Sequence, residues 1–343
     1  MSVLGAESEG ILNHFIKILS FLLAGALLLT VSACAETGYD LDSEAFAGCS
    51  SLTSAYIPPA IQSISADAFD DCPDDFLIVT GVGGGAVQYA LNHTIDYKIS
   101  GSGSGATQYR ALVIGQNYAT TPGWPLFTYA TMDGATFADV LGNSGLFATT
   151  PFEVNDCYDL TASEILAQIS STFGSAGPED VSLFYFSGHG GESGSNLGAL
   201  VGSDGAFVTP TALRSAMDNI QGRKIIIISA CFSGNHIAKY RDAAPGEYFV
   251  LTSSSATQES YGPIYNINFF TYHLLAAIGY DVETGTNAQR AADANGNGVL
   301  TLQEIYRYVY NALKYDENLA YNNHVQTCQV WPSGCEWFGV LRE

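Results

Sequence analysis

The sequence predicts an α/β fold in which a mostly parallel sheet is flanked by helices and preceded by a short repeat segment. Apolar runs rich in β-branched and aromatic residues stop abruptly at glycines, which is typical of buried parallel strands. Segments with helical periodicity lie between these runs, and this alternation predicts right-handed crossovers over both faces of a sheet. Nearer the amino terminus one motif recurs with a period in the low twenties, as stacked structural repeats do.

Two of the predicted strands end in reactive side chains. Residues 184–187 are followed by His189, and residues 225–229 are followed by Cys231. Because α/β sheets place ligands at the carboxyl ends of their strands, we expect both side chains at one sheet edge. A thiol that attacks a carbonyl needs an imidazole within reach, and the amides of Gly190 and Cys231 are candidate donors to an oxyanion. Taken singly, a buried cysteine is more often an inert core residue, and such a histidine is more often a surface residue.

The helices between the strands are predicted from their caps and periodicity. Residues 132–134 precede Phe137, Val140 and Leu141, whose spacing predicts a helix. Thr161 and Glu164 form a capping box that opens a second helix, whose apolar face is made of Ile165, Leu166 and Ile169.

The order of apolar strand, His-Gly, spacer, apolar strand and Cys resembles the cysteine peptidase clan of caspases, metacaspases, legumains and clostripains. Residues 111–118 resemble the first core strand of bacterial caspase-like domains, and residues 249–255 resemble their next strand after the cysteine. The likeness covers roughly residues 108 to 315. It implies that His189 and Cys231 are the catalytic dyad of an endopeptidase that cuts peptide or protein substrates through an acyl-enzyme.

The residues around the cysteine depart from the metacaspase pattern. Metacaspases carry an aspartate two residues before the cysteine, in a pocket for arginine or lysine, whereas this chain has Ser229 there. Legumains draw on a segment that matches residues 253–261, where Glu259 offers a negative charge. The candidate pocket residues are therefore Ser229, Ser254, Glu259 and Ser260, and each is equally interpretable as an ordinary polar loop residue.

A second pattern, at residues 293–304, matches the calcium loop of EF-hands. The predicted ligands are the side chains of Asp293, Asn295, Asn297, Thr301 and Glu304 and the carbonyl of Val299, with Gly296 at the sharp turn. Few charged ligands suit a weak structural site in calcium-rich surroundings. The alternative is a polar turn before a helix, with Thr301 as N-cap and Glu304 completing a capping box, and both can be true of one segment.

The amino terminus predicts export. Residues 18–33 are apolar or small and end at Val31-Ser32-Ala33-Cys34, which resembles the bacterial lipoprotein box. That resemblance implies a signal sequence over residues 1–34, acylation of Cys34, and a lipid anchor outside the cytoplasm in the bacterial cell envelope. The acidic Glu7 and Glu9 ahead of Lys17 depart from the usual pattern. An ordinary signal peptide or an uncleaved anchor are the alternatives, and each still exports the chain.

The motif at residues 45–52 recurs at 68–75, and both copies resemble the BspA-like leucine-rich repeats of bacterial surface proteins. In that reading residues 40–99 form a short repeat segment, and Cys49 and Cys72 are buried ladder residues. Such an array is short, since it has two copies of the motif and about three repeats are needed to bury a continuous core. A Gly/Ser run then predicts a linker over residues 100–107, ahead of a peptidase domain over 108–343.

Charge and cysteine content limit the partners. A formal net charge of −22 argues against binding nucleic acid or anionic lipid by electrostatics. Cys328 and Cys335 lie close enough in sequence for a disulfide, but the pairing stays open, and a catalytic Cys231 must stay reduced. The basic residues that flank the cysteine strand are predicted to be solvated surface charges, with self-processing as the alternative: Arg223, Lys224, Lys239 and Arg241.

The sequence therefore predicts an exported, lipid-anchored cysteine endopeptidase with a caspase-like core and a structural calcium ion. Two rival hypotheses remain. In one, an inactive caspase-like scaffold serves as a surface binding or adhesion protein. In the other, the chain is a calcium-dependent structural component of the envelope.

Overall fold

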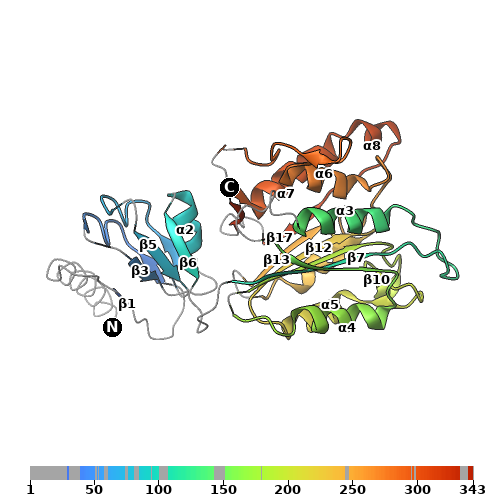
Figure 1. Cartoon of the computed structure of the whole chain (residues 1–343), viewed down its shortest axis with the longest axis horizontal. Helices are drawn as coiled ribbons and strands as arrows, with labels where there is room; N and C mark the ends of the chain where they lie inside the picture. Colours follow the sequence, from blue (N-terminus) through green and yellow to red (C-terminus); the bar gives the residue numbers. More distant parts are fainter. Residues whose placement is uncertain are drawn as a thin grey trace, which may run out of the picture. The chain divides into compact units, whose positions relative to one another are not determined.

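The structure is a computed structural model of the whole chain (Figure 1). It describes residues 29–30, 39–50, 52, 54–57, 61–73, 76–80, 85–93, 95–99, 107–142, 151–178, 180–243, 247–294, 296, 299–332 and 339–342. The chain divides into two compact units, residues 1–102 and residues 103–343. Within the described ranges no helix is long and apolar enough to cross a membrane. The predicted lipidation site at Cys34 lies outside these ranges.

The first unit stacks short parallel strands. One sheet has the order β1-β3-β5-β6 and a second pairs β2 with β4. The elements are β1 (Leu29–Thr30), β2 (Tyr39–Leu41), β3 (Ser54–Ile57), β4 (Ile61–Ile64), β5 (Leu77–Thr80), α2 (Ala86–Asn92) and β6 (Asp96–Ile99). The repeated phenylalanines Phe46 and Phe69 stack with ring centroids 4.9 Å apart. Cys49 and Cys72 pack against this core but are half-buried rather than fully buried, because they sit in turns at its margin.

The second unit is built on one six-stranded sheet with the order β17-β13-β12-β9-β7-β8. Five strands are parallel and the edge strand β17 is antiparallel, which confirms the predicted α/β fold with a mostly parallel sheet. The strands are β7 (Tyr109–Gly115), β8 (Glu153–Tyr158), β9 (Val181–Ser187), β12 (Arg223–Ser229), β13 (Tyr248–Thr252) and β17 (Gln329–Trp331).

Helices cover both faces of this sheet (Figure 1). One face carries α3 (Ala130–Gly142), α6 (Phe269–Ile278) and α7 (Leu302–Lys314), and the other carries α4 (Ala162–Phe173) and α5 (Pro210–Asp218). The side chains of a strand alternate between the faces, so Ile225 and Ile227 join the first core whereas Ile226 and Ile228 join the second. Because both faces of the sheet are covered, the central strands are apolar over most of their length.

Shorter elements complete the second unit. They are η1 (Gly194–Asn196), β10 (Leu200–Val201), β11 (Phe207–Val208), η2 (Ser233–Lys239), β14 (Tyr280–Asp281), β15 (Thr286–Asn287), β16 (Val299–Thr301), α8 (Glu317–Tyr321) and β18 (Gly339–Arg342). Both predicted capping boxes are present, at Thr161 with Glu164 and at Thr301 with Glu304.

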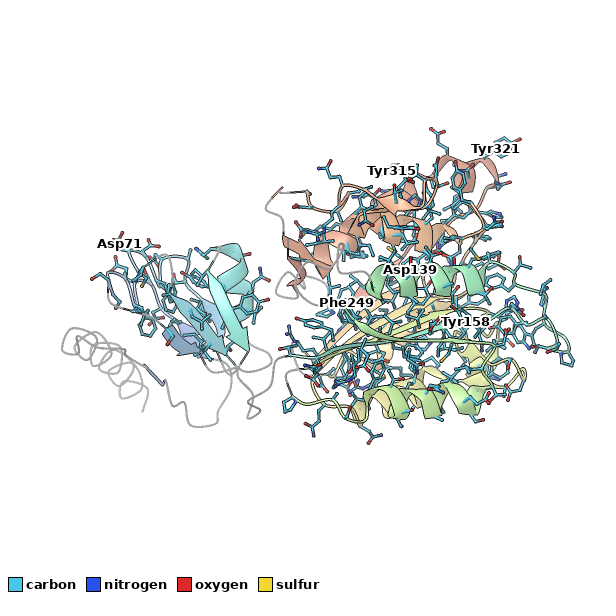
Figure 2. All side chains as sticks on the ribbon, viewed as in Figure 1. Asp71, Asp139, Tyr158, Phe249, Tyr315 and Tyr321 are labelled. Atoms are coloured by element: carbon cyan, nitrogen blue, oxygen red, sulfur yellow. The ribbon has the colours of Figure 1, made fainter. Side chains whose placement is uncertain are left out.

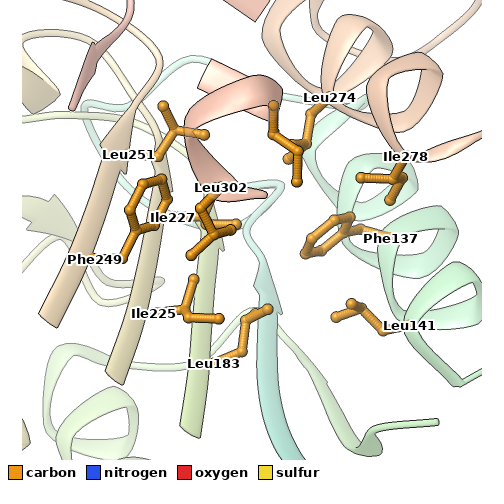
Figure 3. Close-up of a pocket in the computed structure, with 11 residues that line it drawn as sticks. Phe137, Leu141, Leu183, Ile225, Ile227, Phe249, Leu251, Leu274, Ile278 and Leu302 are labelled. Carbon is orange, nitrogen blue, oxygen red and sulfur yellow. The ribbon is translucent and has the colours of Figure 1, made fainter. Parts of the chain in front are cut away.

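A small cavity remains between the sheet and α3, α6 and α7, and its walls are apolar throughout (Figure 3). Its volume is about 30 Å³, and among its lining residues are Phe137, Ile227 and Leu302. A cavity without polar partners offers water no hydrogen bonds, so we expect it to be dry.

The expectation of solvated cations around the cysteine strand is wrong for Arg223 and Lys224. Both are buried at the start of β12, a central strand flanked on both sides. The Lys224 ammonium donates to Glu247 at 2.9 Å and to the Ile220 carbonyl at 3.0 Å. Lys239 and Arg241 are exposed, as predicted. Cys335 lies outside the described residues, so the pairing of the buried Cys328 stays open.

Candidate active site

The sheet brings His189 and Cys231 to neighbouring strand ends. Strands β9 and β12 are adjacent and parallel, and Ser187 is the register partner of Ser229. His189 and Cys231 each stand two residues beyond these partners. A Cβ added at Gly190 would lie 2.0 Å from the Cys231 carbonyl oxygen, so the two backbones are in contact and only glycine fits there.

The imidazole of His189 is held at one nitrogen by a backbone carbonyl. Its Nε2 lies 2.9 Å from the carbonyl oxygen of Pro125. Because a carbonyl oxygen only accepts, Nε2 carries the proton of the neutral ring, and Nδ1 keeps the lone pair. The ring packs against Tyr118, Trp124 and Phe127, with centroids 4.6, 5.2 and 4.7 Å away. The Tyr118 hydroxyl also accepts the His189 backbone N–H at 2.8 Å.

Burial sets the protonation states of the pair. Burial lowers the pKa of His189, although the Pro125 carbonyl opposes that shift. Burial also raises the pKa of the Cys231 thiol, and the negative charges of Glu259 and Glu192 raise it further. Desolvation disfavours the charged form of each group. At neutral pH the resting thiol and the resting imidazole are therefore both neutral.

The turn that carries Cys231 is fixed by three buried serines. The Ser254 hydroxyl donates to the Ala230 carbonyl at 3.0 Å and accepts the Ser233 N–H at 3.3 Å, while Ser253 accepts the Ala230 N–H at 3.1 Å. Ser254 is wholly buried and its hydroxyl bonds the turn, which favours the alternative of a structural polar residue over a pocket residue. Ser229 is also buried, and its carbonyl accepts the Gly188 N–H at 3.1 Å.

Of the other two pocket candidates, Ser260 contacts the thiol. Ser260 is half-buried and its backbone N–H approaches the Cys231 sulfur at 3.4 Å, whereas Glu259 is exposed. Gln326, which the sequence did not single out, holds this loop: its Nε2 donates to the Ser260 hydroxyl at 3.2 Å, and its Oε1 accepts the Tyr261 N–H at 2.9 Å.

The two candidate oxyanion donors differ in their hydrogen bonds. Among the residues that the structure describes, the Gly190 backbone N–H donates none, whereas the Cys231 backbone N–H points at its own sulfur and lowers the pKa of that thiol. An unpaired amide beside a nucleophile can stabilise a tetrahedral oxyanion.

The predicted calcium loop is described only in part, because Asn295 and Asn297 lie outside the described ranges. Gly296 has φ +68°, and its N–H donates to the Asp293 carboxylate at 2.9 Å. Thr301 ends β16, and Glu304 accepts the Thr301 N–H at 2.9 Å. No group of three or more His, Cys, Asp or Glu side chains that could hold a metal occurs among the described residues.

Comparison with known proteins supplies the family. A family model described as the caspase domain matches residues 108–328. The crystal structure of protein GSU0716 from Geobacter sulfurreducens aligns with a TM-score of 0.47 and 14% identity, over 69% of this chain and 100% of that chain. Caspase-1 from Spodoptera frugiperda aligns with a TM-score of 0.46 and 15% identity, over 65% and 86%. Among curated proteins none matches the sequence.

Proposed function

Because the chain belongs to the caspase-domain family, we propose that it is a cysteine endopeptidase that hydrolyses peptide bonds with Cys231 and His189. The observation that carries the proposal is the contact of the two strand ends, where the Gly190 backbone lies against that of Cys231. Two adjacent parallel strands thus deliver a thiol and an imidazole to one sheet edge, where α/β folds bind ligands.

The first half of the reaction follows from the tautomer of His189. As the Cys231 sulfur bonds to the scissile carbonyl carbon, its proton passes to Nδ1, the nitrogen with the lone pair. The imidazolium that forms keeps its Nε2–H on the Pro125 carbonyl. The carbonyl oxygen becomes an oxyanion, which accepts from the Gly190 and Cys231 amides. The C–N bond then breaks, Nδ1 returns its proton to the leaving amine, and a thioester remains on Cys231.

The second half uses the same groups with water in place of the amine. Nδ1 takes a proton from water as the oxygen attacks the thioester carbonyl, and the same amides hold the second oxyanion. Collapse releases a carboxylic acid product and restores the thiol. Since the resting pair is neutral, His189 acts as a general base in both halves.

We infer a preference for basic residues at the cleavage site. Glu192 and Glu259 are exposed on loops that follow β9 and β13, and both raise the pKa of Cys231, so their charges reach the thiol. Two carboxylates beside the nucleophile attract a cationic substrate side chain and repel an acidic one. Ser260 adds a polar group next to the sulfur.

Hydrolysis of a fluorogenic peptide library, varied at the residue before the cut, tests the proposal. Protein lacking residues 1–34 is expected to cleave Arg and Lys peptides, Cys231→Ala is expected to cleave none, and Cys157→Ala, a half-buried cysteine of β8, is the matched control. Loss of activity in the control, or activity retained in Cys231→Ala, contradicts the assignment. A folded, reduced protein without turnover favours the binding or adhesion role instead.

We also propose that residues 293–304 hold a structural calcium ion. The positive φ of Gly296, its bond to Asp293 and the strand β16 that follows support a loop of the EF-hand type. Calcium is expected to raise the unfolding temperature in wild-type protein and not in Glu304→Gln. Glu164→Gln is the matched control, because Glu164 closes the same kind of capping box away from the loop. Equal calcium dependence in all three proteins contradicts the site.

For the amino terminus we propose cleavage and acylation at Cys34, which would anchor the chain in the bacterial envelope. Incorporation of a labelled fatty acid that disappears in Cys34→Ser is the expected result, and labelling that persists in that variant contradicts it. For residues 40–99 we propose stacked leucine-rich repeats, supported by the stacking of Phe46 on Phe69.

A further inference from the structure

A fully buried carboxyl group that the proposed mechanism does not use lies in the first turn of α3. Asp133 is inaccessible to solvent, and it accepts from the Ser187 hydroxyl at 2.5 Å and from the Asn268 N–H at 2.9 Å. The Asn268 side-chain amide donates to it as well. Burial raises the pKa of Asp133 to about 7, against the effect of these donors. A buried carboxyl with three donors calls for an explanation, because removing it from water is costly.

The two partners of Asp133 stand next to the candidate dyad. Ser187 is the last residue of β9, two residues before His189. Asn268 caps α6 and ends the loop that begins with Ser260, whose N–H contacts the Cys231 sulfur. Asp133 thereby connects the turn that carries the imidazole to the loop that flanks the thiol.

The segment that leads into the helix of Asp133 also reaches the candidate site, and the Asp133 backbone N–H donates to its Tyr129 carbonyl at 2.8 Å. This segment supplies the Pro125 carbonyl that holds Nε2 of His189. Tyr129, four residues before Asp133, packs on the thiol loop, since a Cβ at Gly262 would lie 2.8 Å from its ring. Burial and the charges of Asp133 and Cys231 raise the pKa of Tyr129, so this ring lies within electrostatic reach of both groups.

The hydrogen bonds leave the Asn268 side chain one orientation. Its Oδ1 accepts the Thr271 N–H at 2.7 Å as the helix cap, so its Nδ2 must face Asp133. Thr271 in turn bonds the hydroxyl of Tyr185 on β9 at 2.6 Å. The Asp133 carboxylate is therefore an acceptor that faces a donor, the Asn268 side-chain nitrogen. Changing only one of the two groups would place two donors or two acceptors against each other.

We propose that Asp133 is a positioning residue for peptide hydrolysis: by accepting hydrogen bonds from Ser187 and Asn268, it holds the His189 turn and the Cys231 loop in mutual alignment. The inference rests on the proposed peptidase function. It assigns Asp133 no contact with the substrate. Small displacements of a catalytic pair lower the rate of the chemical step strongly, so the effect should appear in kcat.

An exchange of the two side chains tests the proposal. Asp133→Asn places an amide nitrogen against either the side-chain nitrogen or the backbone N–H of Asn268, donor against donor in both orientations. Adding Asn268→Asp restores an acceptor there, and the new carboxylate still caps α6. We expect a loss of about tenfold or more in kcat for the single variant, with KM within about threefold, and recovery to within about threefold of wild type in the double variant. Asp139→Asn, on the exposed side of the same helix (Figure 2), should match wild type.

A single variant within about twofold of wild type, or a double variant no faster than the single one, overturns the proposal. The unfolding temperature of each protein is measured alongside. If kcat recovers in the double variant while its unfolding temperature does not, the effect of Asp133 on kcat is due to positioning and not to stability of the fold. If Asp133→Asn does not fold, Ser187→Ala removes one donor only and should lower kcat about threefold or more, and an unchanged kcat there overturns the proposal too.

Failure of the peptidase function itself is recognised separately, because wild type then hydrolyses no peptide. In that case the rate at which iodoacetamide alkylates Cys231 can still be measured by mass spectrometry of the peptide that contains it. This rate depends on how His189 and the loop are positioned around the thiol. The rate is expected to fall in Asp133→Asn and to recover in the double variant. Equal rates in all variants overturn the role of Asp133 even without a substrate.

Discussion

Replacing His236 should make the second unit more stable near pH 5 than near pH 8. His236 lies in η2 with no solvent exposure, and its Nε2 bonds the Gly198 carbonyl at 2.9 Å. Among the described residues its Nδ1 has no hydrogen-bond partner. Burial lowers its pKa from 6.5 to about 4. At a pH between these two values the histidine is protonated in the unfolded chain and neutral in the folded chain. The contribution of His236 to the free energy of unfolding is therefore fully present above about pH 6.5 and is lost as the pH falls toward 4.

The magnitude follows from the two pKa values. At about pH 5 the unfolded histidine is almost fully protonated and the folded one almost not, which lowers the free energy of unfolding by about 2 kcal/mol relative to pH 8. Asp133 acts in the opposite sense. Its raised pKa gives stability below about pH 4 that is lost as the pH rises toward 7. The two contributions nearly cancel in wild type, so a variant of one group is needed to see either.

Urea unfolding of wild type and His236→Gln at about pH 5 and 8 measures the effect, because glutamine keeps the donor to Gly198 and does not titrate. All three tryptophans, Trp124, Trp331 and Trp337, belong to the second unit, so their fluorescence reports its unfolding alone. His324→Gln replaces an exposed histidine and is the matched control. A pH dependence in His236→Gln equal to that of wild type refutes the reasoning.

Three further changes have defined outcomes. Gly190→Ala places a Cβ 2.0 Å from the Cys231 carbonyl oxygen and should abolish hydrolysis. The control Gly142→Ala places its Cβ 3.9 Å from the nearest side chain and should leave hydrolysis intact. Equal activity of the two variants contradicts the backbone contact between Gly190 and Cys231. Leu302→Ala enlarges the apolar cavity and should cost about 2–5 kcal/mol of unfolding free energy, and a cost below about 1 is inconsistent with it. Replacing Glu192 and Glu259 together by glutamine should lower the pH midpoint of Cys231 alkylation, and an unchanged midpoint argues against their influence.

The sheet and its two reactive strand ends were predictable from local pattern. The run from Phe184 to Ser187 and the isoleucines of β12 are apolar because both faces of the sheet are covered, and the glycine at 190 marks a close backbone approach. Capping boxes depend on residues three apart, so Thr161 and Thr301 were correctly identified as N-caps.

What could not be predicted depends on distant contacts or on the backbone. The group that fixes the His189 tautomer is a carbonyl of Pro125, and a carbonyl has no signal in the sequence. Asp133 looked like an ordinary residue at a helix start, because its partner Asn268 lies far away in the chain. Lys224 looked solvated because its partner Glu247 lies on the approach to the next strand. For Ser254 the sequence left two interpretations open, because its hydrogen bonds beneath the cysteine turn join segments that are distant in the chain.

Trapping of the acyl-enzyme tests the central claim most directly. A peptide ester that ends in lysine is mixed with the protein, quenched in acid within the first turnover, and the digest is examined by mass spectrometry. We expect the peptidyl acyl group on Cys231, no such adduct on Cys157, and neither adduct nor product in Cys231→Ala. Product formation without an acyl group on Cys231, or with Cys231 absent, would contradict the account.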